Sequence, residues 1–319
     1  MSSVPAHSEG APGAHRAAIR RGTRLAKARV VFGDAYDDHS DPRWIAPWLE
    51  ARAYLGGGAT SRVYDGYDHR AAREVAIKVA RAGLDARTLQ RLQREVTALE
   101  AVHHDNVVGV LGHGLLEDGR PYVVMQRVWG EPLHDVLAKK PRLRMPWQDA
   151  VPLAIALLDA LGAVHRAGIV HRDVKPANVL VSPHRGPILV DLGFAHLGDA
   201  GPRLTPDGRV VGTPGFIPPE LLLGTSGVTP SADVYAMGVM LFQMLVGAAP
   251  FSGALSEMIQ TIMTGPRPDV LAYVPDVPRA IATTVRLALS RDPTKRYADG
   301  DAMAAALRAA LASLEPAAL

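Results

Sequence analysis

The spacing of hydrophobic residues changes along the chain. From Val63 to Val79, β-branched residues alternate with polar ones, and this period of two predicts antiparallel strands. Over residues 88–102 the period changes to three and four, which predicts an amphipathic helix. Its apolar face comprises Leu89, Leu92, Val96 and Leu99. Two further apolar runs, at 107–111 and 122–125, indicate strands again.

The pattern becomes mainly helical after Trp129 and Gly130. The clearest predicted helices cover residues 149–166, 232–246, 281–289 and 300–314. A small strand-rich part therefore precedes a larger helical part, which indicates an α+β protein with either two folding units or one domain of two lobes.

The first fifty residues differ from the rest in composition. Six of the 35 basic residues, but only one of the 32 acidic residues, lie within residues 1–30. The remainder is close to neutral, so the main body has no excess of positive charge for binding nucleic acid. We expect residues 1–50 to form an N-terminal extension. Trp44 and Trp48, four residues apart, are expected to share one helical face that pins this extension to the folded part.

The chain contains no cysteine, which excludes disulfides, thiolate metal sites and a thiol nucleophile. Its two longest apolar runs, at 151–164 and 234–246, are each interrupted by a polar residue. Both are shorter than the ~18 uninterrupted apolar residues that a membrane span needs. We therefore expect no membrane span and a cytoplasmic location.

Two short motifs in the strand-rich part suggest a phosphate-binding site. Residues 55–63 read Leu-Gly-Gly-Gly-Ala-Thr-Ser-Arg-Val, and glycines allow a backbone to approach a phosphate closely. Taken alone, such a stretch before a strand is more often an ordinary turn. Residues 75–78 read Val-Ala-Ile-Lys, where the lysine either faces water or needs a partner for its charge. Glu95, on the predicted helix, could supply that partner.

A third motif makes the functional interpretation of the sequence specific. Residues 171–178 read His-Arg-Asp-Val-Lys-Pro-Ala-Asn, and Asp-Leu-Gly follows at 191–193. With the glycine-rich stretch and Val-Ala-Ile-Lys before them, these motifs resemble the signatures of eukaryotic-like protein serine/threonine kinases, in the family's order. The resemblance covers residues 52–314, and the composition is typical of a bacterial, soluble member. Two residues depart from the family's motifs: Ser61 stands where the glycine-rich loop has its third glycine, and Leu192 stands where the Asp-Phe-Gly motif has phenylalanine.

The resemblance implies the two-lobed protein-kinase fold. We expect an N-lobe at 51–125 with an antiparallel β-sheet and one long helix, a hinge at 126–130, a mainly helical C-lobe at 131–314, and a tail at 315–319. Residues 212–220 resemble the end of an activation segment, and residues 233–238 resemble the helix that anchors the catalytic loop. Arg296 resembles the arginine that pairs with the glutamate of that segment, here Glu220.

The resemblance also implies the chemistry. The cosubstrate is ATP, the metal is Mg²⁺ with Mn²⁺ as an alternative, and the acceptors are serine and threonine hydroxyls of proteins. Asp173 is expected to accept the hydroxyl proton, and Lys175 to steady the transferred phosphoryl group. Asn178 and Asp191 are expected to hold the metal.

Lys78 is expected to bind the phosphates, with Glu95 holding it in place. The adenine base is expected among Val63, Ala76, Met125 and Leu180. These four residues could also be ordinary core, but the motif spacing favours the adenine cleft. The full predicted ATP site comprises Leu55, Gly56, Gly57, Gly58, Ala59, Ser61, Val63, Ala76, Lys78, Glu95, Met125, Gln126, Val128 and Leu180.

Thr205 is the only hydroxyl-bearing residue between Asp191 and Gly212, and we expect it to be an autophosphorylation site. A homodimer for phosphorylation in trans is left open. Two rival functions remain: a pseudokinase that binds partners without turnover, and a small-molecule phosphotransferase. The motif residues, all present, argue against the first. Lys175 and residues 212–220 argue against the second.

Overall fold

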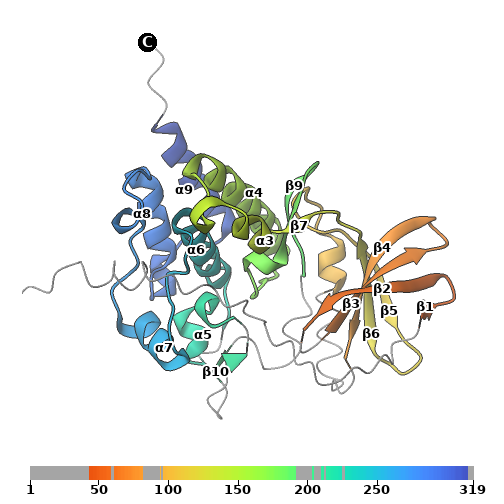
Figure 1. Cartoon of the computed structure of the whole chain (residues 1–319). Helices are drawn as coiled ribbons and strands as arrows, with labels where there is room; N and C mark the ends of the chain where they lie inside the picture. Colours follow the sequence, from red (N-terminus) through yellow and green to blue (C-terminus); the bar gives the residue numbers. More distant parts are fainter. Residues whose placement is uncertain are drawn as a thin grey trace, which may run out of the picture. The chain divides into compact units, whose positions relative to one another are not determined.

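The computed structural model describes residues 43–58, 61–81, 94, 96–191, 203–204, 210–211, 213–224 and 227–314. The chain divides into two compact units, Met1–Asp41 and Pro42–Leu319. All the described residues belong to the second unit, whose helices and strands are labelled in Figure 1.

Six antiparallel strands form the N-lobe sheet, which confirms the predicted strand-rich part. They are β1 (Trp44–Ala46), β2 (Leu49–Gly57), β3 (Ser61–Asp68), β4 (Arg73–Ala80), β5 (Val110–Leu115) and β6 (Pro121–Gln126). Their order in the sheet is β1-β2-β3-β4-β6-β5. β1 and the first residues of β2 precede the predicted domain start at residue 51. Of the predicted helix at 88–102, the described part is helical at 94 and 96–100.

Two local predictions are wrong. Trp44 and Trp48 do not share a helical face: Trp44 lies in β1 and Trp48 in the tight turn before β2. β1 instead pairs with the edge of β2, where backbone groups are available for hydrogen bonds. The strand predicted at 107–111 begins only at Val110. Residues 107–108 instead bond to the end of a C-lobe strand, since the Val108 amide donates to the Leu189 carbonyl at 3.0 Å.

Alternation along β4 divides the N-lobe side chains between two apolar clusters. Val75, Ile77 and Val79 belong to a cluster on one face of the sheet. Ala76 and Ala80 belong to the large cluster that continues into the C-lobe. Because successive side chains of a strand point to opposite faces, Lys78 lies on the same face as Ala76 and Ala80. The strand period therefore turns this lysine toward the C-lobe.

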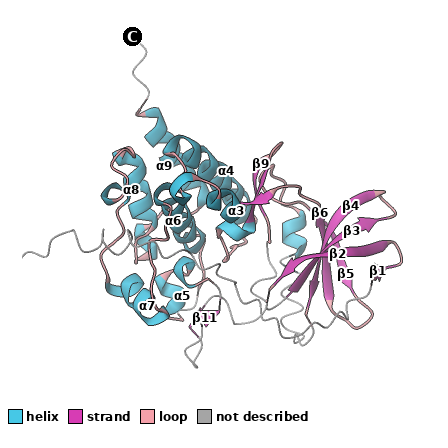
Figure 2. Cartoon of the chain, viewed as in Figure 1, coloured by secondary structure: helices cyan, strands magenta, loops and turns pink. Residues whose placement is uncertain are grey.

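The C-lobe is mainly helical, as predicted (Figure 2). Its helices are α3 (Leu133–Ala138), α4 (Trp147–Arg166), α5 (Pro219–Leu222), α6 (Ser231–Val246), α7 (Leu255–Thr264), α8 (Arg279–Ala288) and α9 (Gly300–Ala312). A small antiparallel sheet joins β7 (Glu131–Pro132), β8 (Val179–Ser182) and β9 (Gly186–Leu189). A third, two-stranded sheet pairs β10 (Arg203–Leu204) with β11 (Val210–Val211).

Helices α4 and α6 form the centre of the C-lobe. Nearly every residue of α6 is buried, which fits a helix that is apolar on all sides. Within the described part of the chain, α4 is the one helix long and apolar enough to cross a membrane, and half of its most apolar window is buried inside the protein. It packs against α6 and α9, so its apolar character is accounted for by the core.

Glu50 is the centre of an ion-pair network on β2. Its carboxylate accepts hydrogen bonds from Arg43 Nη2 at 2.7 Å and from Arg52 Nε at 3.3 Å, and contacts His69 Nε2 at 3.3 Å. The bond from Arg43, helped by those from His69 and Arg52, outweighs burial and lowers the pKa of Glu50 to about 2. The ionised carboxylate is therefore the form that stabilises the fold.

This network predicts a pH-dependent effect of replacing Glu50. Because its pKa is lower in the folded than in the unfolded protein, its contribution is fully present above about pH 4.5 and is lost as the pH falls toward about 2. The stability difference between wild type and Glu50→Gln should shrink over that range, as measured by urea unfolding at a series of pH values. Exposed Glu117→Gln is the matched control. A difference for Glu50→Gln that stays constant with pH would contradict this account.

Candidate active site

The loop at 171–178 is held in place by the carboxylate of Asp233, a buried residue of α6. Asp233 Oδ1 accepts a hydrogen bond from the Arg172 amide at 2.7 Å, and Oδ2 accepts from the His171 amide at 2.8 Å. Burial raises the pKa of Asp233, but the hydrogen bond from His165 and the neighbouring donors outweigh it and bring the pKa below its usual value. Arg172 adopts a positive φ of 67°, which is costly for a non-glycine residue. The two amide bonds to Asp233 stabilise this turn.

Two histidines extend this network, and their partners fix their tautomers. The Gly300 amide donates to His165 Nδ1 at 3.2 Å, so Nε2 carries the hydrogen that binds Asp233 Oδ2 at 2.9 Å. The Asp173 amide donates to His171 Nδ1 at 3.4 Å, so His171 Nε2 donates to the Val190 carbonyl at 3.3 Å. His171 thus links the loop to the residue next to Asp191.

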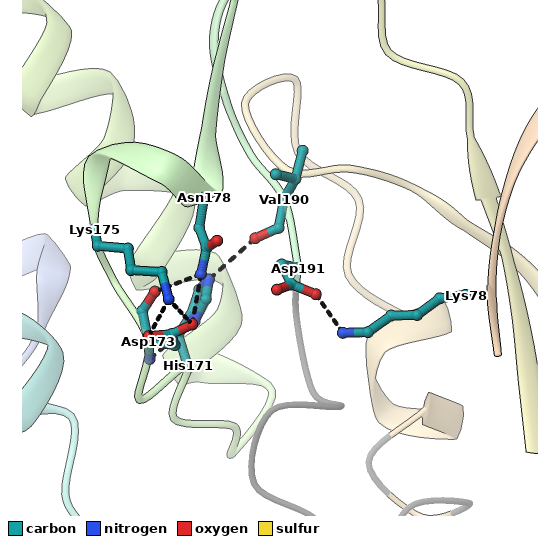
Figure 3. Close-up of polar contacts among 7 residues, drawn as sticks. All are labelled: Lys78, His171, Asp173, Lys175, Asn178, Val190 and Asp191. Carbon is teal, nitrogen blue, oxygen red and sulfur yellow. Dashed lines mark hydrogen bonds and ion pairs between the residues drawn. The ribbon is translucent and has the colours of Figure 1, made fainter. Parts of the chain in front are cut away.

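Asp173, Lys175 and Asn178 form one polar cluster (Figure 3). Lys175 Nζ donates to both carboxylate oxygens of Asp173, at 2.9 Å and 2.7 Å. Asn178 Nδ2 donates to Asp173 Oδ2 and to its backbone carbonyl, both at 2.8 Å. Since the amide nitrogen of Asn178 is used in this way, its oxygen remains the group that can accept or coordinate. The structure therefore brings together the three predicted catalytic residues.

A separate ion pair, between Lys78 and Asp191, joins the two lobes. Lys78 on β4, with its side chain 1% exposed, is ion-paired with Asp191, which follows β9. Burial raises the pKa of Asp191, but the charge and hydrogen bond of Lys78, aided by His171 and Lys175, hold the pKa below its usual value. Asp191, 35% exposed, is therefore an ionised carboxylate accessible to solvent.

The residues present fit a hard divalent cation. An ionised carboxylate on Asp191 and an amide oxygen on Asn178 are the oxygen donors that such cations prefer. Among the described residues, no group of three or more histidine, aspartate or glutamate side chains could hold a metal alone. These two residues would therefore share the cation with oxygens from another molecule, as phosphate groups provide.

Four apolar residues predicted to surround the base belong to one cluster: Val63, Ala76, Met125 and Leu180. In the sheet, Ala76 lies opposite Met125. The predicted hinge begins where β6 ends, and the Gln126 amide there already donates to the Gly109 carbonyl at 2.8 Å. These contacts assemble the residues of the predicted base site from four separate strands.

The glycine-rich stretch forms the end of β2 and the turn into β3. Leu55, Gly56 and Gly57 lie in β2, with Leu55 exposed. The Gly58 amide donates to the Ser61 carbonyl at 2.9 Å, and a Cβ on Gly57 would meet that same carbonyl at 2.7 Å. A side chain at Gly57 would therefore disrupt the turn. Four predicted residues lie outside the described part of the chain: Ala59, Glu95, Leu192 and Thr205.

Glu220 and Arg296 form the pair that the resemblance implies. Arg296 donates from both terminal nitrogens to the two carboxylate oxygens of Glu220, each at 2.7 Å. Its Nε also donates to the Ser290 carbonyl at 2.7 Å, and its side chain is fully buried. Such a bidentate pair fixes the position of α5 against the segment before α9.

A cavity of about 760 Å³ lies between α4, the segment 102–107 and Arg185. Among the described residues predicted to bind nucleotide, Gln126 alone lines it, and the residues of the described loop at 171–178 do not. This cavity is therefore separate from the polar cluster around Asp173.

The motif residues lie in the arrangement that the resemblance to protein kinases implies, and comparisons with known proteins agree on the family. The protein kinase domain model matches residues 49–307. Serine/threonine-protein kinase PknL of Mycobacterium bovis is 36% identical over 263 residues, covering 81% of this chain and 64% of that protein. Kinase pkn3 of Myxococcus xanthus is 34% identical, covering 83% of this chain and 50% of that protein. The chain belongs to the protein kinase domain family.

A solved structure shares the fold. The crystal structure of the Mycobacterium tuberculosis PknI kinase domain matches with a TM-score of 0.66 and 22% identity, covering 85% of this chain and 100% of that domain. The chain spans less than two thirds of the length of the curated relatives it matches. Family membership implies the use of ATP and a divalent metal.

Proposed function

We propose that this chain is an active protein serine/threonine kinase that transfers the γ-phosphate of ATP to serine and threonine hydroxyls of proteins. The observation that carries this proposal is the cluster in which Lys175 and Asn178 both hold the carboxylate of Asp173. Curated relatives with the name serine/threonine-protein kinase support it.

Asp173 is the general base in this reaction. The substrate hydroxyl oxygen forms a bond to the γ-phosphorus while the bond to the β,γ-bridging oxygen breaks, and ADP leaves. The hydroxyl proton passes to a carboxylate oxygen of Asp173. Positioning by such a base commonly contributes about 10² to 10⁴ in rate. Lys175, which contacts the carboxylate of Asp173, would supply positive charge where the transferred phosphoryl group becomes more negative.

Asn178 and Asp191 would hold the metal, which we propose to be Mg²⁺ with Mn²⁺ as an alternative. A bound divalent cation neutralises phosphate charge and orients the oxygens. The ion pair of Asp191 with Lys78 supports this assignment, because Lys78 is then placed to contact phosphate oxygens beside the metal. Ser61 and Gly58 form the turn that would cover those phosphates.

The base of ATP would lie among Val63, Ala76, Met125 and Leu180, with backbone groups of Gln126 and Val128 as hydrogen-bond partners. The shared apolar cluster supports this placement. We propose a cytoplasmic protein whose partners are ATP and substrate proteins, with a homodimer as the unit of autophosphorylation. The kinase domain would comprise residues 51–314 together with the strands that precede residue 51.

Replacing the general base provides the direct test. Asp173→Asn should lower phosphate transfer from labelled ATP by about 10² or more, because the amide cannot accept the hydroxyl proton. ATP binding, measured by titration calorimetry with Mg²⁺, should stay within about threefold of wild type. Asp276→Asn, an exposed loop residue, is the matched control and should keep full activity.

An inactive wild type that still binds ATP would contradict the proposal and favour a binding module without turnover. Equal activity of wild type and Asp173→Asn would show that the phosphate transfer comes from another enzyme in the preparation.

We propose Thr205 as the autophosphorylation site, because it is the hydroxyl-bearing residue between Asp191 and Gly212. After phosphatase treatment and incubation with ATP and Mg²⁺, mass spectrometry should find phosphate on Thr205 in wild type but not in Asp173→Asn. Thr205→Ala should have lower substrate phosphorylation than wild type, whereas the helix-surface variant Thr264→Ala should not. Full activity of phosphatase-treated Thr205→Ala, equal to phosphorylated wild type, would refute a regulatory role for Thr205.

A further inference from the structure

The hinge contains a side-chain contact that none of the sequence motifs indicates. Arg127 Nε donates to Asp65 Oδ1 on β3 at 2.5 Å, and Arg127 Nη1 donates to the Val128 carbonyl at 2.8 Å. The guanidinium carbon also lies 4.1 Å from the centre of the Trp129 ring. One side chain thus joins the hinge backbone, an exposed hinge aromatic residue and a strand 62 residues earlier.

Strand register places this contact beside the predicted base site. Asp65 lies two residues after Val63 on β3 and directly opposite Ala76, which in turn lies opposite Met125. Residues two apart on a strand share a face, so Asp65 lies on the face of the sheet that carries Val63. Arg127 follows Met125 by two residues and reaches Asp65 from that side.

The ion pair between Arg127 and Asp65 is less exposed to solvent than an ordinary surface ion pair. The side chains of Arg127 and Asp65 are only 16% and 26% exposed, so solvent screens them less than it screens fully exposed charges. The guanidinium group uses separate nitrogens for the carboxylate and for the carbonyl, which the single ammonium group of lysine cannot reproduce in the same geometry. The contact therefore fixes both the distance from the hinge to β3 and the conformation of the hinge backbone.

We propose that Arg127 is a positioning residue of the nucleotide site, acting through Asp65. The pair holds β3 against the hinge, so that Val63 stays over the base. This inference rests on the proposed function, since it concerns the same site. Without the pair, nucleotide binding has to order the hinge and β3 itself, and that ordering reduces affinity.

The test compares Arg127→Gln, Asp65→Asn and the double variant with wild type. KM for ATP should rise about five- to tenfold in each single variant, and kcat should stay within about twofold. KM for ATP in the double variant should be no higher than in the poorer single variant, because each single substitution already removes the ion pair between Arg127 and Asp65. Arg127→Lys should fall between wild type and Arg127→Gln.

The matched control is Asp118→Asn, which removes the 2.7 Å pair with Arg120 at the β5–β6 turn of the same sheet. It should leave KM for ATP unchanged. A purely structural role for Arg127 would instead lower the melting temperature and the active fraction without changing KM. An unchanged KM in both Arg127→Gln and Asp65→Asn would overturn the proposal. Should Arg127→Gln fail to fold, Asp65→Asn alone decides.

The dissociation constant for ATP with Mg²⁺, measured by calorimetry, separates this inference from the proposed function. The same five- to tenfold weakening is expected when Arg127→Gln is added to an Asp173→Asn background, where no phosphate is transferred. A wild type that binds ATP but transfers no phosphate would refute the proposed function and leave this comparison valid. A wild type that binds no ATP would overturn both.

Discussion

The carboxylate of Asp233 is the interaction on which the active site depends. A buried charge is costly unless hydrogen bonds satisfy it, and this one accepts from two loop amides and from His165. The amides belong to His171 and Arg172, directly before Asp173, so the position of the base follows from a residue on the central helix. His171 continues the network to Val190, which places Asp191 relative to the same loop.

The N-lobe positions its active-site residues through the alternation of side chains along a strand, rather than through a buried polar network. Because β4 is buried on both faces, its odd and even residues belong to different apolar clusters. This alternation directs Lys78 toward Asp191 and places Ala76 opposite Met125. On the same face of the sheet, the ion pair of Arg127 with Asp65 links β3 to the hinge. Among the described contacts between the two lobes are the Lys78–Asp191 ion pair, the bond from the Val108 amide to the Leu189 carbonyl, and the hinge.

Local patterns predicted the secondary-structure elements well, because these depend on short stretches of sequence. The motif residues chosen as charged site residues also lie close together in the structure. The period of two predicted β3 and β4, and the helical period predicted α4, α6, α8 and α9. The strand predicted at 107–111 was displaced because residues 107–108 bond to Leu189, and the β5–β6 register shifts between Val110 and Gly112. Such irregularities arise from tertiary pairing, which a local pattern does not contain.

Side-chain pairs between residues far apart in the sequence could not be predicted from local patterns. Arg127 and Asp65 are 62 residues apart, and Glu50 and His69 are 19 apart. Which of many arginines meets which carboxylate depends on register and on the two irregularities in β2–β3 pairing. For the same reason the tautomers of His165 and His171 followed only from their three-dimensional partners.

Amide hydrogen exchange in Asp233→Asn tests the central role of this carboxylate most directly. Asparagine has one acceptor oxygen and a donating nitrogen, so it cannot accept from both loop amides and from His165. The account predicts that the amides of His171 and Arg172 exchange at least about tenfold faster than in wild type, while the interior amides of α6 keep their protection. Unchanged protection of the His171 and Arg172 amides would contradict it.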